Sequence, residues 1–140
     1  MALLRNPSFE TGVAPWQPEN LPNAVALQSF TTGLARSGTT VLTAQTNQAG
    51  GSFRQDFPSN APSVFAFAWV RASSTPVLAQ LTLWDGGTSI STFFAADSQN
   101  WSFITNTIGL SNPGQVRQVR FEIYIFSVNT VLLVDSANAW

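Results

Sequence analysis

Val64-Phe65-Ala66-Phe67-Ala68-Trp69-Val70-Arg71 is the stretch of sequence that decides the fold. Two kinds of residue alternate along it, small aliphatic ones and rings that end in an arginine. Successive side chains of a strand point to opposite faces, so this period of two predicts a β-strand. We assign the aliphatic row, Val64, Ala66, Ala68 and Val70, to the core. The outer face then carries Phe65, Phe67, Trp69 and Arg71.

Short segments of the same kind recur along the chain, separated by Gly, Pro, Asn and Ser. No stretch shows a helical period of useful length, and neither a repeat nor a linker interrupts the pattern. Short strands with frequent turns predict one all-β domain over residues 1–140, a β-sandwich of two antiparallel sheets. Besides 64–71, we expect strands at 24–30, 39–44, 52–57, 77–84, 89–94, 101–108, 116–126 and 131–135.

Two of these segments divide their residues as the first one does. Ala79, Leu81, Leu83, Phe121, Ile123 and Ile125 are expected inside. Rings next to charges or amides then face outward on three strands, and a patch of that size marks an interaction site. We expect one sheet face to carry Phe65, Phe67, Trp69, Arg71, Gln80, Trp84, Glu122, Tyr124 and Phe126. The strand order, which decides whether these residues are neighbours, stays open.

The composition excludes several functions. The chain has no His, Cys or Lys, which removes a Ser-His-Asp triad, a thiolate metal site and the commonest general base. A net charge of −1 predicts no nucleic-acid partner and no binding to a membrane surface. A glycosidase needs two carboxylates at a set separation, and nothing in the spacing of Asp85 and Glu122 supports such a pair. We therefore expect a protein that is not an enzyme.

The polar surface suits one class of ligand. Only 9% of residues are charged, whereas Ser, Thr, Asn and Gln are abundant. Hydroxyls and amides favour neutral, hydroxyl-rich ligands, although a bacterial, secreted protein from a high-GC genome has the same composition. Residues 1–5 are too short for a signal peptide. The chain is thus either made without export or is a module of a larger extracellular or cell-surface protein, such as a multidomain enzyme.

The two ends of the chain carry a candidate metal site. Glu10 lies in the first turn, and Asp135 ends the last apolar run. If the termini meet, two carboxylates come together with no lysine to pair them. Calcium, which is bound by oxygen atoms, is the simplest counter-charge.

Six motifs in order resemble the carbohydrate-binding modules of the family four, nine and twenty-two group. The opening Asn6-Pro7-Ser8-Phe9-Glu10-Thr11-Gly12, followed by Trp16, is similar to their Asn-x-x-Phe-Glu-x-Gly start. Segments 35–42, 53–57 and 64–71 resemble their Ser-Gly strand entry, their Gln-bearing strand and their Trp-Val-Lys strand. Trp101 and the ending Leu133-Val134-Asp135 complete the resemblance.

The resemblance implies a galactose-binding-domain-like jelly roll that binds glycans on a concave sheet face or at loops at one end. It also implies a structural calcium ion held by Glu10, a backbone oxygen near Ser37 or Gly38, and Asp135. The family often has two acids at the end, whereas Ser136 follows Asp135 here.

Two functions follow from these observations. The first is a non-catalytic glycan-binding module, because sugars stack their C–H faces on indole rings and place their hydroxyls against polar side chains. Its candidate ligand residues are Trp69, Arg71, Gln80, Trp84, Glu122 and Tyr124. The alternative is a structural or assembly domain that forms a homo-oligomer through its aromatic sheet face. Phe65, Phe67 and Phe126 favour this alternative, because they make the face more apolar than a sugar platform requires.

Overall fold

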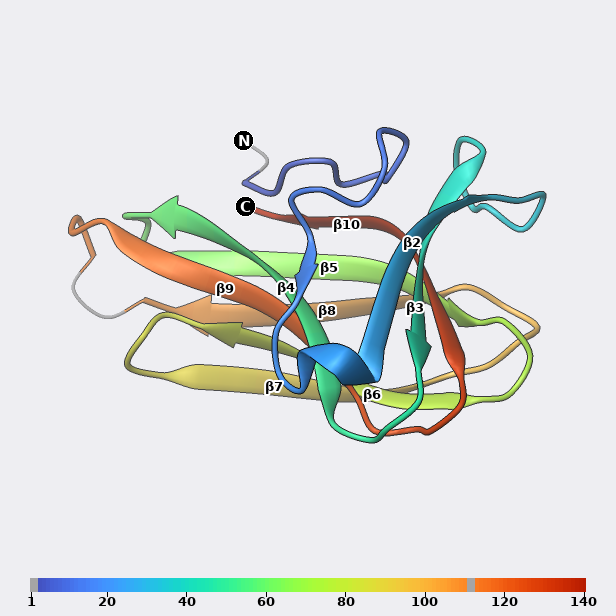
Figure 1. Cartoon of the computed structure of the whole chain (residues 1–140). Coiled ribbons are helices and arrows are strands. Elements are labelled where there is room, and N and C mark those ends of the chain that lie inside the picture. Colours follow the sequence, from blue (N-terminus) through green and yellow to red (C-terminus); the bar gives the residue numbers. More distant parts are fainter. Residues whose placement is uncertain (1–2, 111–112) are drawn as a thin grey trace.

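The computed structural model describes residues 3–110 and 113–140. Within them the chain forms ten strands and one short 3-10 helix, arranged as two packed sheets (Figure 1). The elements are β1 (Gln17–Pro18), η1 (Pro22–Ala24), β2 (Val25–Thr31), β3 (Thr40–Thr46), β4 (Gly51–Ser59), β5 (Ser63–Ala72), β6 (Val77–Trp84), β7 (Ser89–Ala96), β8 (Ser102–Gly109), β9 (Arg117–Ile125) and β10 (Val131–Ala139).

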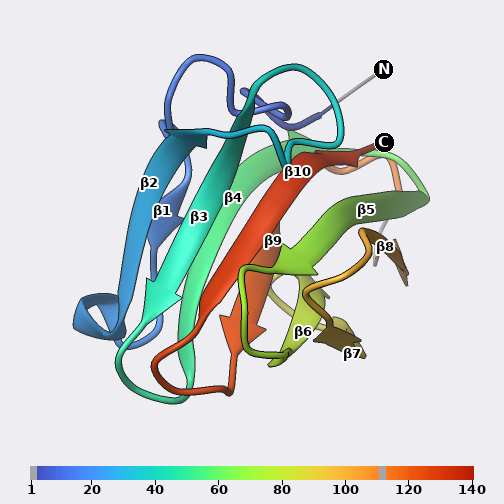
Figure 2. The ribbon, with the colours of Figure 1, turned by 90° about the vertical axis from the view of Figure 1, so that its right-hand side faces the viewer.

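The two sheets have five strands each, and all of their pairs are antiparallel. The front sheet has the order β1-β4-β9-β6-β7, and the back sheet has the order β2-β3-β10-β5-β8. Figure 2 looks onto the back sheet, whose strands follow in this order from left to right. From β3 onward the chain crosses between the sheets at almost every connection, as in a jelly roll. The expected all-β sandwich of two antiparallel sheets is confirmed.

All nine expected strands are present, with small differences at their ends. β10 continues four residues beyond the expected end because a bulge absorbs the irregularity after Asp135, where Ser136 has a φ of 59°. β1 and η1 were not predicted from the sequence, since two or three residues show no periodicity.

The inward and outward faces are also as expected. The side chains of Val64, Ala66, Ala68 and Val70 are fully buried, and so are those of Leu81, Leu83, Phe121, Ile123 and Ile125. Trp16 seals the core at the N-terminal side, where its ring lies 5.6 Å from that of Phe9 and 5.4 Å from that of Phe121. The core therefore fixes which side chains of each strand remain on the outer faces.

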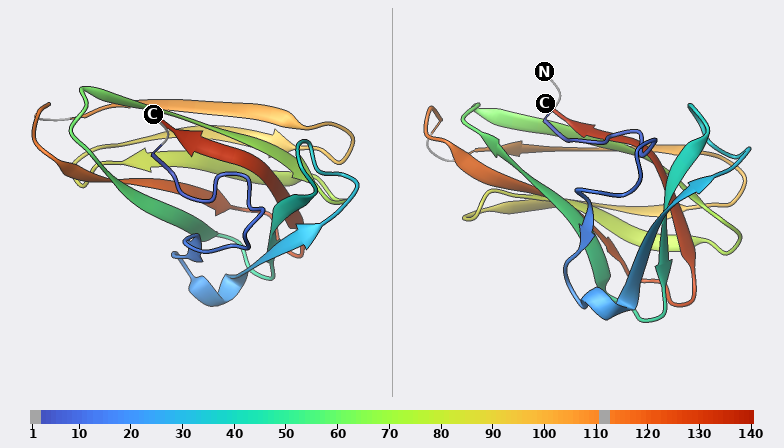
Figure 3. Two further views of the ribbon diagram at one scale, coloured as in Figure 1. Left: turned by 90° about the horizontal axis from the view of Figure 1, so that it is seen from above. Right: turned by 45° about the horizontal axis from the view of Figure 1, so that its top comes forward.

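The described N-terminal segment, from residue 3 onward, lies beside the end of β10, which the metal hypothesis requires (Figures 1 and 3). The N–H of Leu3 donates to the carbonyl of Ala139 over 2.8 Å, and the N–H of Ala137 donates to that of Pro7 over 2.9 Å. The N-terminal segment thus runs along the end of β10. No helix among the described residues has the length and hydropathy that crossing a bilayer requires.

Candidate functional site: a polar cleft on the front sheet

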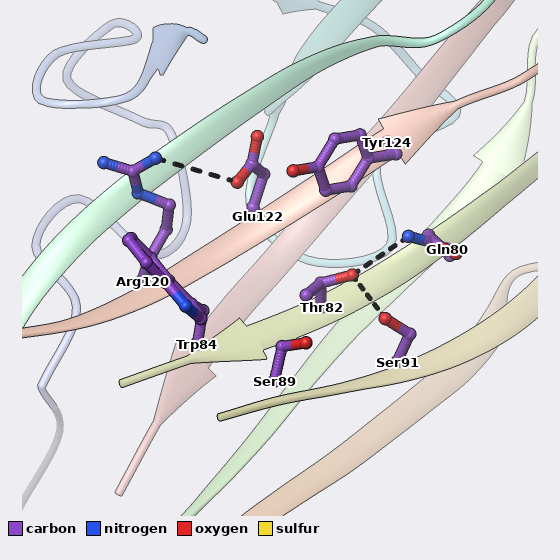
Figure 4. A pocket seen from close by; sticks show the side chains of 8 residues that line it. All are labelled: Gln80, Thr82, Trp84, Ser89, Ser91, Arg120, Glu122 and Tyr124. Atoms are coloured by element: carbon purple, nitrogen blue, oxygen red, sulfur yellow. Dashed lines mark hydrogen bonds and ion pairs between the residues drawn. The ribbon is translucent and has the colours of Figure 1, made fainter. Parts of the chain in front are cut away.

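The outer face of the front sheet carries a regular grid of side chains. β9, β6 and β7 are neighbours, and their register sets outward residues opposite one another in rows. The first row is Arg120, Trp84 and Ser89, the second is Glu122, Thr82 and Ser91, and the third is Tyr124, Gln80 and Phe93. The first two rows, with Tyr124 and Gln80, line a cleft of about 390 Å³ (Figure 4).

This cleft brings together four of the six candidate ligand residues, Gln80, Trp84, Glu122 and Tyr124. The other four lining residues, Thr82, Ser89, Ser91 and Arg120, were not among the candidates predicted from the sequence. Period-two alternation alone places Thr82 and Arg120 outward. The two serines become candidates only when the strand order is known, because β7 lies next to β6 and sets Ser89 opposite Trp84 and Ser91 opposite Thr82.

The expectation that three strands share one outer face is wrong. β5 belongs to the back sheet, between β10 and β8, so Trp69 and Arg71 face away from the cleft. The guanidinium of Arg36 covers the ring of Trp69, 3.9 Å from its centroid, and Arg71 donates from Nη2 to the carbonyl of Ser98 over 2.8 Å. Alternation fixes which face of a strand points inward, whereas long-range pairing decides which sheet the strand joins.

The rings of the back sheet contact one another along its outer face. Trp69 lies 4.9 Å from Phe103, which lies 5.3 Å from Phe67, and Phe67 stacks on Trp140 at 5.3 Å. Phe67 therefore has rings on two sides. A sugar needs an open ring face, and the ring of Phe67 is used for packing against Phe103 and Trp140.

A network of ion pairs holds Arg120, one of the residues that line the cleft. Arg120 donates from Nε to Oδ1 of Asp56 over 2.9 Å and from Nη1 to Oε1 of Glu19 over 3.1 Å. Arg54 pairs with both of these acids, at 2.7 Å from Glu19 and 3.1 Å from Asp56. The hydrogen bond with Arg54 lowers the pKa of Glu19, and the hydrogen bond with Asp56 raises the pKa of Arg120. The network fixes the position of Arg120 beside the cleft.

The floor of the cleft consists of hydrogen-bonding groups. Glu122 is only 4% exposed, and its Oε2 accepts a hydrogen bond from the hydroxyl of Ser52. The hydroxyl of Thr82 lies 3.2 Å from Nε2 of Gln80 and 2.8 Å from the hydroxyl of Ser91. Hydroxyls and amides both donate and accept, so the floor can match ligand hydroxyls of either orientation.

Tyr124 follows Glu122 by two residues on β9, and its phenol lies beside the carboxylate of Glu122 (Figure 4). Burial raises the pKa of Tyr124, and the charge of Glu122 and a hydrogen bond with it raise it further. The phenol is therefore neutral over the physiological pH range and remains a hydrogen-bonding group. At the other end of the cleft, Trp84 keeps 42% of its surface exposed.

The proposed metal ligands gather around one loop, between residues 37 and 40. Oδ2 of Asp135 accepts the N–H of Ser37 over 2.8 Å, and Oε1 of Glu10 accepts the N–H groups of Thr39 and Thr40 over 3.1 and 3.2 Å. Gly38 has a φ of +62°, and a Cβ at this position would collide with Oε1 of Glu10. The structure thus brings Glu10, Ser37, Gly38 and Asp135 together.

The loop offers a hard cation a buried carboxylate, but it offers few acidic side chains. Asp135 is fully buried, and no arginine in the described part of the chain forms an ion pair with it. A buried carboxylate without a cation is costly. The described residues contain no group of three or more His, Cys, Asp or Glu side chains suited to a metal. A bound ion would therefore need backbone carbonyls as ligands, which calcium accepts.

No protein-family model and no curated protein sequence matches the chain. Solved structures, however, resemble it over its whole length. One is TmCBM61 in complex with β-1,4-galactotriose, at 18% identity and a TM-score of 0.74, with 100% of this chain and 98% of that chain covered. Another is the CBM22-1 xylan-binding domain of Paenibacillus barcinonensis Xyn10C, at 14% identity and a TM-score of 0.73, with 99% and 91% covered.

A third similar structure is a CBM4 protein, at 11% identity and a TM-score of 0.70, with 96% of this chain and 97% of that chain covered. Identities this low establish the architecture of the chain and not its ligand. The resemblance inferred from the six motifs is confirmed at this level. The chain has the β-sandwich fold of the carbohydrate-binding modules of families 61, 22 and 4.

Proposed function

We propose that the protein is a non-catalytic glycan-binding module whose ligand lies in the cleft of the front sheet. One observation carries the proposal: the ring of Trp84, 42% exposed, stands in the same cleft as a group of hydroxyl and amide side chains, those of Gln80, Thr82, Ser89 and Ser91. A sugar ring presents an apolar C–H face and a rim of hydroxyls, so it needs both parts.

The similar structures support this assignment. TmCBM61 is in complex with β-1,4-galactotriose, and the Paenibacillus module is described as xylan-binding. A two-module structure from Clostridium thermocellum Xyn10B, of which this chain covers 28%, is complexed with xylohexaose. All three are associated with neutral, chain-forming sugars. We therefore take galactan and xylan as the first ligands to test.

The acids of the cleft support a non-catalytic role. Glu122 is the one carboxylate among the eight described residues that line the cleft. Hydrolysis of a glycosidic bond by the usual route needs two. Asp85, the other acid considered from the sequence, accepts the N–H groups of Gly87 and Thr88 and so organises the turn after β6.

Calcium is part of the proposal, as a structural ion between the two ends of the chain. It would be held by Glu10, Asp135 and backbone oxygens of the loop near Ser37 and Gly38. The buried carboxylate of Asp135 is the observation that supports it. Such an ion would fix the loop to β10, and it would take no part in ligand binding because the site lies on the back sheet.

The proposal extends to the setting in which the protein acts. Similar modules occur in tandem in Xyn10C, where this chain covers 44% of the structure, and next to a GH10 module in Xyn10B. We place the chain in a larger extracellular or cell-surface protein. A shallow site of this kind binds weakly by itself, and linkage to further modules raises its effective concentration at the polysaccharide.

Binding to soluble galactan, xylan and mixed-linkage glucan, measured by affinity electrophoresis and calorimetry, tests the function. We expect binding to at least one of these neutral polymers and no release of reducing sugar. Failure to bind any neutral glycan on a broad array would refute the proposal. Release of reducing sugar that a Glu122→Gln variant abolishes would contradict the non-catalytic role.

A further inference from the structure

The polar cleft continues into an apolar hollow on the same sheet face. The hollow has a volume of about 400 Å³ and is lined by Leu78, Ala79, Phe93, Phe94, Ala95 and Phe126. These six residues, all in the described part of the chain, have no polar side-chain group. The change from polar groups to hydrocarbon is abrupt, because it occurs between two successive outward residues of each segment. The pairs are Gln80 and Leu78 on β6, Ser91 and Phe93 on β7, and Tyr124 and Phe126 at the end of β9.

Three of the lining side chains are unusually open to water. Phe93 is 74% exposed, Leu78 is 57% exposed and Phe126 is 39% exposed. The rings of Phe93 and Phe126 lie nearly parallel, with their centroids 6.2 Å apart and an angle of 26° between their planes. Apolar surface of this kind, gathered in one place, marks a site that something apolar covers.

The hollow and the cleft form one continuous surface. Phe93 on β7 is the direct cross-strand neighbour of Gln80 on β6, which lines the cleft. Phe126 follows Tyr124 by two residues, and its N–H donates to the carbonyl of Leu78 over 2.8 Å. Two residues along a strand correspond to roughly 7 Å. A single ligand in the cleft therefore reaches the hollow without leaving the sheet face.

The chemistry of the two parts differs in what it can bind. A sugar in the hollow would bring hydroxyls against hydrocarbon and find no side-chain partner there, and unmatched polar groups weaken binding. A hydrocarbon group has no such requirement and gains from covering both rings. The whole surface therefore matches a ligand that is hydroxylated along one part and apolar at the next.

We propose that the ligand is a glycan that carries apolar acyl substituents. Its sugar rings occupy the polar cleft, and an acyl group attached to the chain lies in the hollow against Phe93 and Phe126. This inference rests on the proposed function, since it uses the cleft as the sugar site. It adds the substrate class, an esterified polysaccharide in place of an unsubstituted one.

A comparison of one polymer in two forms tests the inference. Xylan and galactan are lightly butyrylated, and half of each preparation is de-esterified with mild alkali. Substituents placed along the chain make the test independent of the direction in which the glycan lies. The transfer of a butyryl chain out of water corresponds to roughly tenfold in affinity, about 1.4 kcal/mol. We expect the wild-type protein to bind the esterified form about tenfold more tightly.

Two variants connect this advantage to the hollow. Phe93→Ser and Phe126→Ser should each remove most of the advantage and leave the affinity for the de-esterified polymer unchanged. Phe65→Ser is the matched control, because Phe65 is 39% exposed but lies on the back sheet. It should keep the full difference between the two forms, and melting curves confirm that each variant is folded.

The other outcomes separate the inference from the proposed function. Equal binding of the two forms by the wild-type protein would overturn the inference and leave glycan binding intact. A loss of affinity for the de-esterified polymer in Phe93→Ser would make the hollow an ordinary sugar subsite and also overturn it. A dimer that Phe93→Ser dissociates would assign the hollow to a second copy of the chain. Failure of both forms to bind would overturn the inference and the function together.

Discussion

The guanidinium of Arg120 lies over the indole ring of Trp84, 5.3 Å from guanidinium carbon to ring centroid. This is within the range of a cation–π contact. Arg120 is itself held by Asp56 on the neighbouring strand β4 and by Glu19, which follows β1, so the orientation of the ring depends on this ion-pair network. The most exposed aromatic group of the polar cleft is therefore fixed before any ligand arrives.

Replacement of Trp84 tests whether this ring binds the glycan. Trp84→Ala should weaken binding by at least about 2 kcal/mol, as expected for an aromatic hot spot. The melting temperature should change little, because the ring is 42% exposed. Trp140→Ala, at a ring that is 45% exposed and stacks on Phe67, is the matched control and should bind normally. Calorimetry on both variants, with the polymer that the wild-type protein binds most tightly, measures the difference in affinity.

The same measurement on Trp69→Ala decides between the two sheets. Because the structure places Trp69 on the back sheet under Arg36, its loss should leave glycan affinity unchanged. A large loss in Trp69→Ala together with normal binding in Trp84→Ala would move the ligand site to the back sheet.

Tyr124 is a spectroscopic probe of the cleft, since it is the one tyrosine of the sequence. Burial raises its pKa above the ordinary value of 10.0, so the midpoint of an ultraviolet titration of the phenol should lie above pH 10. Glu122→Gln should lower this pKa, because it removes the neighbouring negative charge. A wild-type phenol that ionises at its ordinary pH would contradict the structure of the cleft.

The sign of the linked stability change follows from the same shift. A pKa that is higher in the folded protein means that the folded state holds the proton more tightly. The contribution of Tyr124 to stability is thus fully present below pH 10 and is lost as the pH rises through the folded pKa. The free energy of unfolding, measured by chemical denaturation at a series of pH values, should depend on pH differently in the wild-type protein and in Tyr124→Phe only in this alkaline range.

Removal of the proposed calcium ion should destabilise the protein. A ligand bound only by the folded state stabilises it by about 2.7 kcal/mol at a hundredfold excess over its Kd. Added chelator should therefore lower the melting temperature of metal-loaded protein. Asp135→Asn should abolish this response, because it keeps the shape of the side chain and removes its charge. Asp97→Asn, at an exposed acid, serves as the control. An unchanged melting curve in protein shown to contain the metal would refute the proposal.

Gly38 tests the role of the loop independently of any metal. Gly38→Ala should destabilise the protein by about 1–3 kcal/mol, because its φ of +62° is unfavourable with a Cβ and that atom would collide with Glu10. Gly33→Ala is the control in the same segment, where a Cβ meets nothing within 4 Å. In a Glu10→Ala background the cost of Gly38→Ala should fall, leaving the backbone contribution. An equal cost in both backgrounds would show that the collision does not matter.

The sequence was sufficient to predict every strand except the two-residue β1, together with the inward and outward faces of β5, β6 and β9. In β5 the small residues Val64 and Ala66 are fully buried, while Phe65 is exposed, as the alternation predicts. This works because successive side chains of a strand must point to opposite sides, whatever the rest of the fold does. The order of the motifs also indicated the fold, and the pairing of the N-terminal segment with the end of β10 agrees with the expectation that the termini meet.

The tertiary structure alone decided which outer faces are shared. Trp69 and Trp84 both belong to the outward-facing residues of their strands. However, β5 pairs with β10 and β8, whereas β6 pairs with β9 and β7. Strand pairing depends on contacts between residues far apart in the chain, and local alternation carries no information about them. The cleft, the hollow beside it and the separation of Trp69 from both therefore emerge only when the two sheets are assembled.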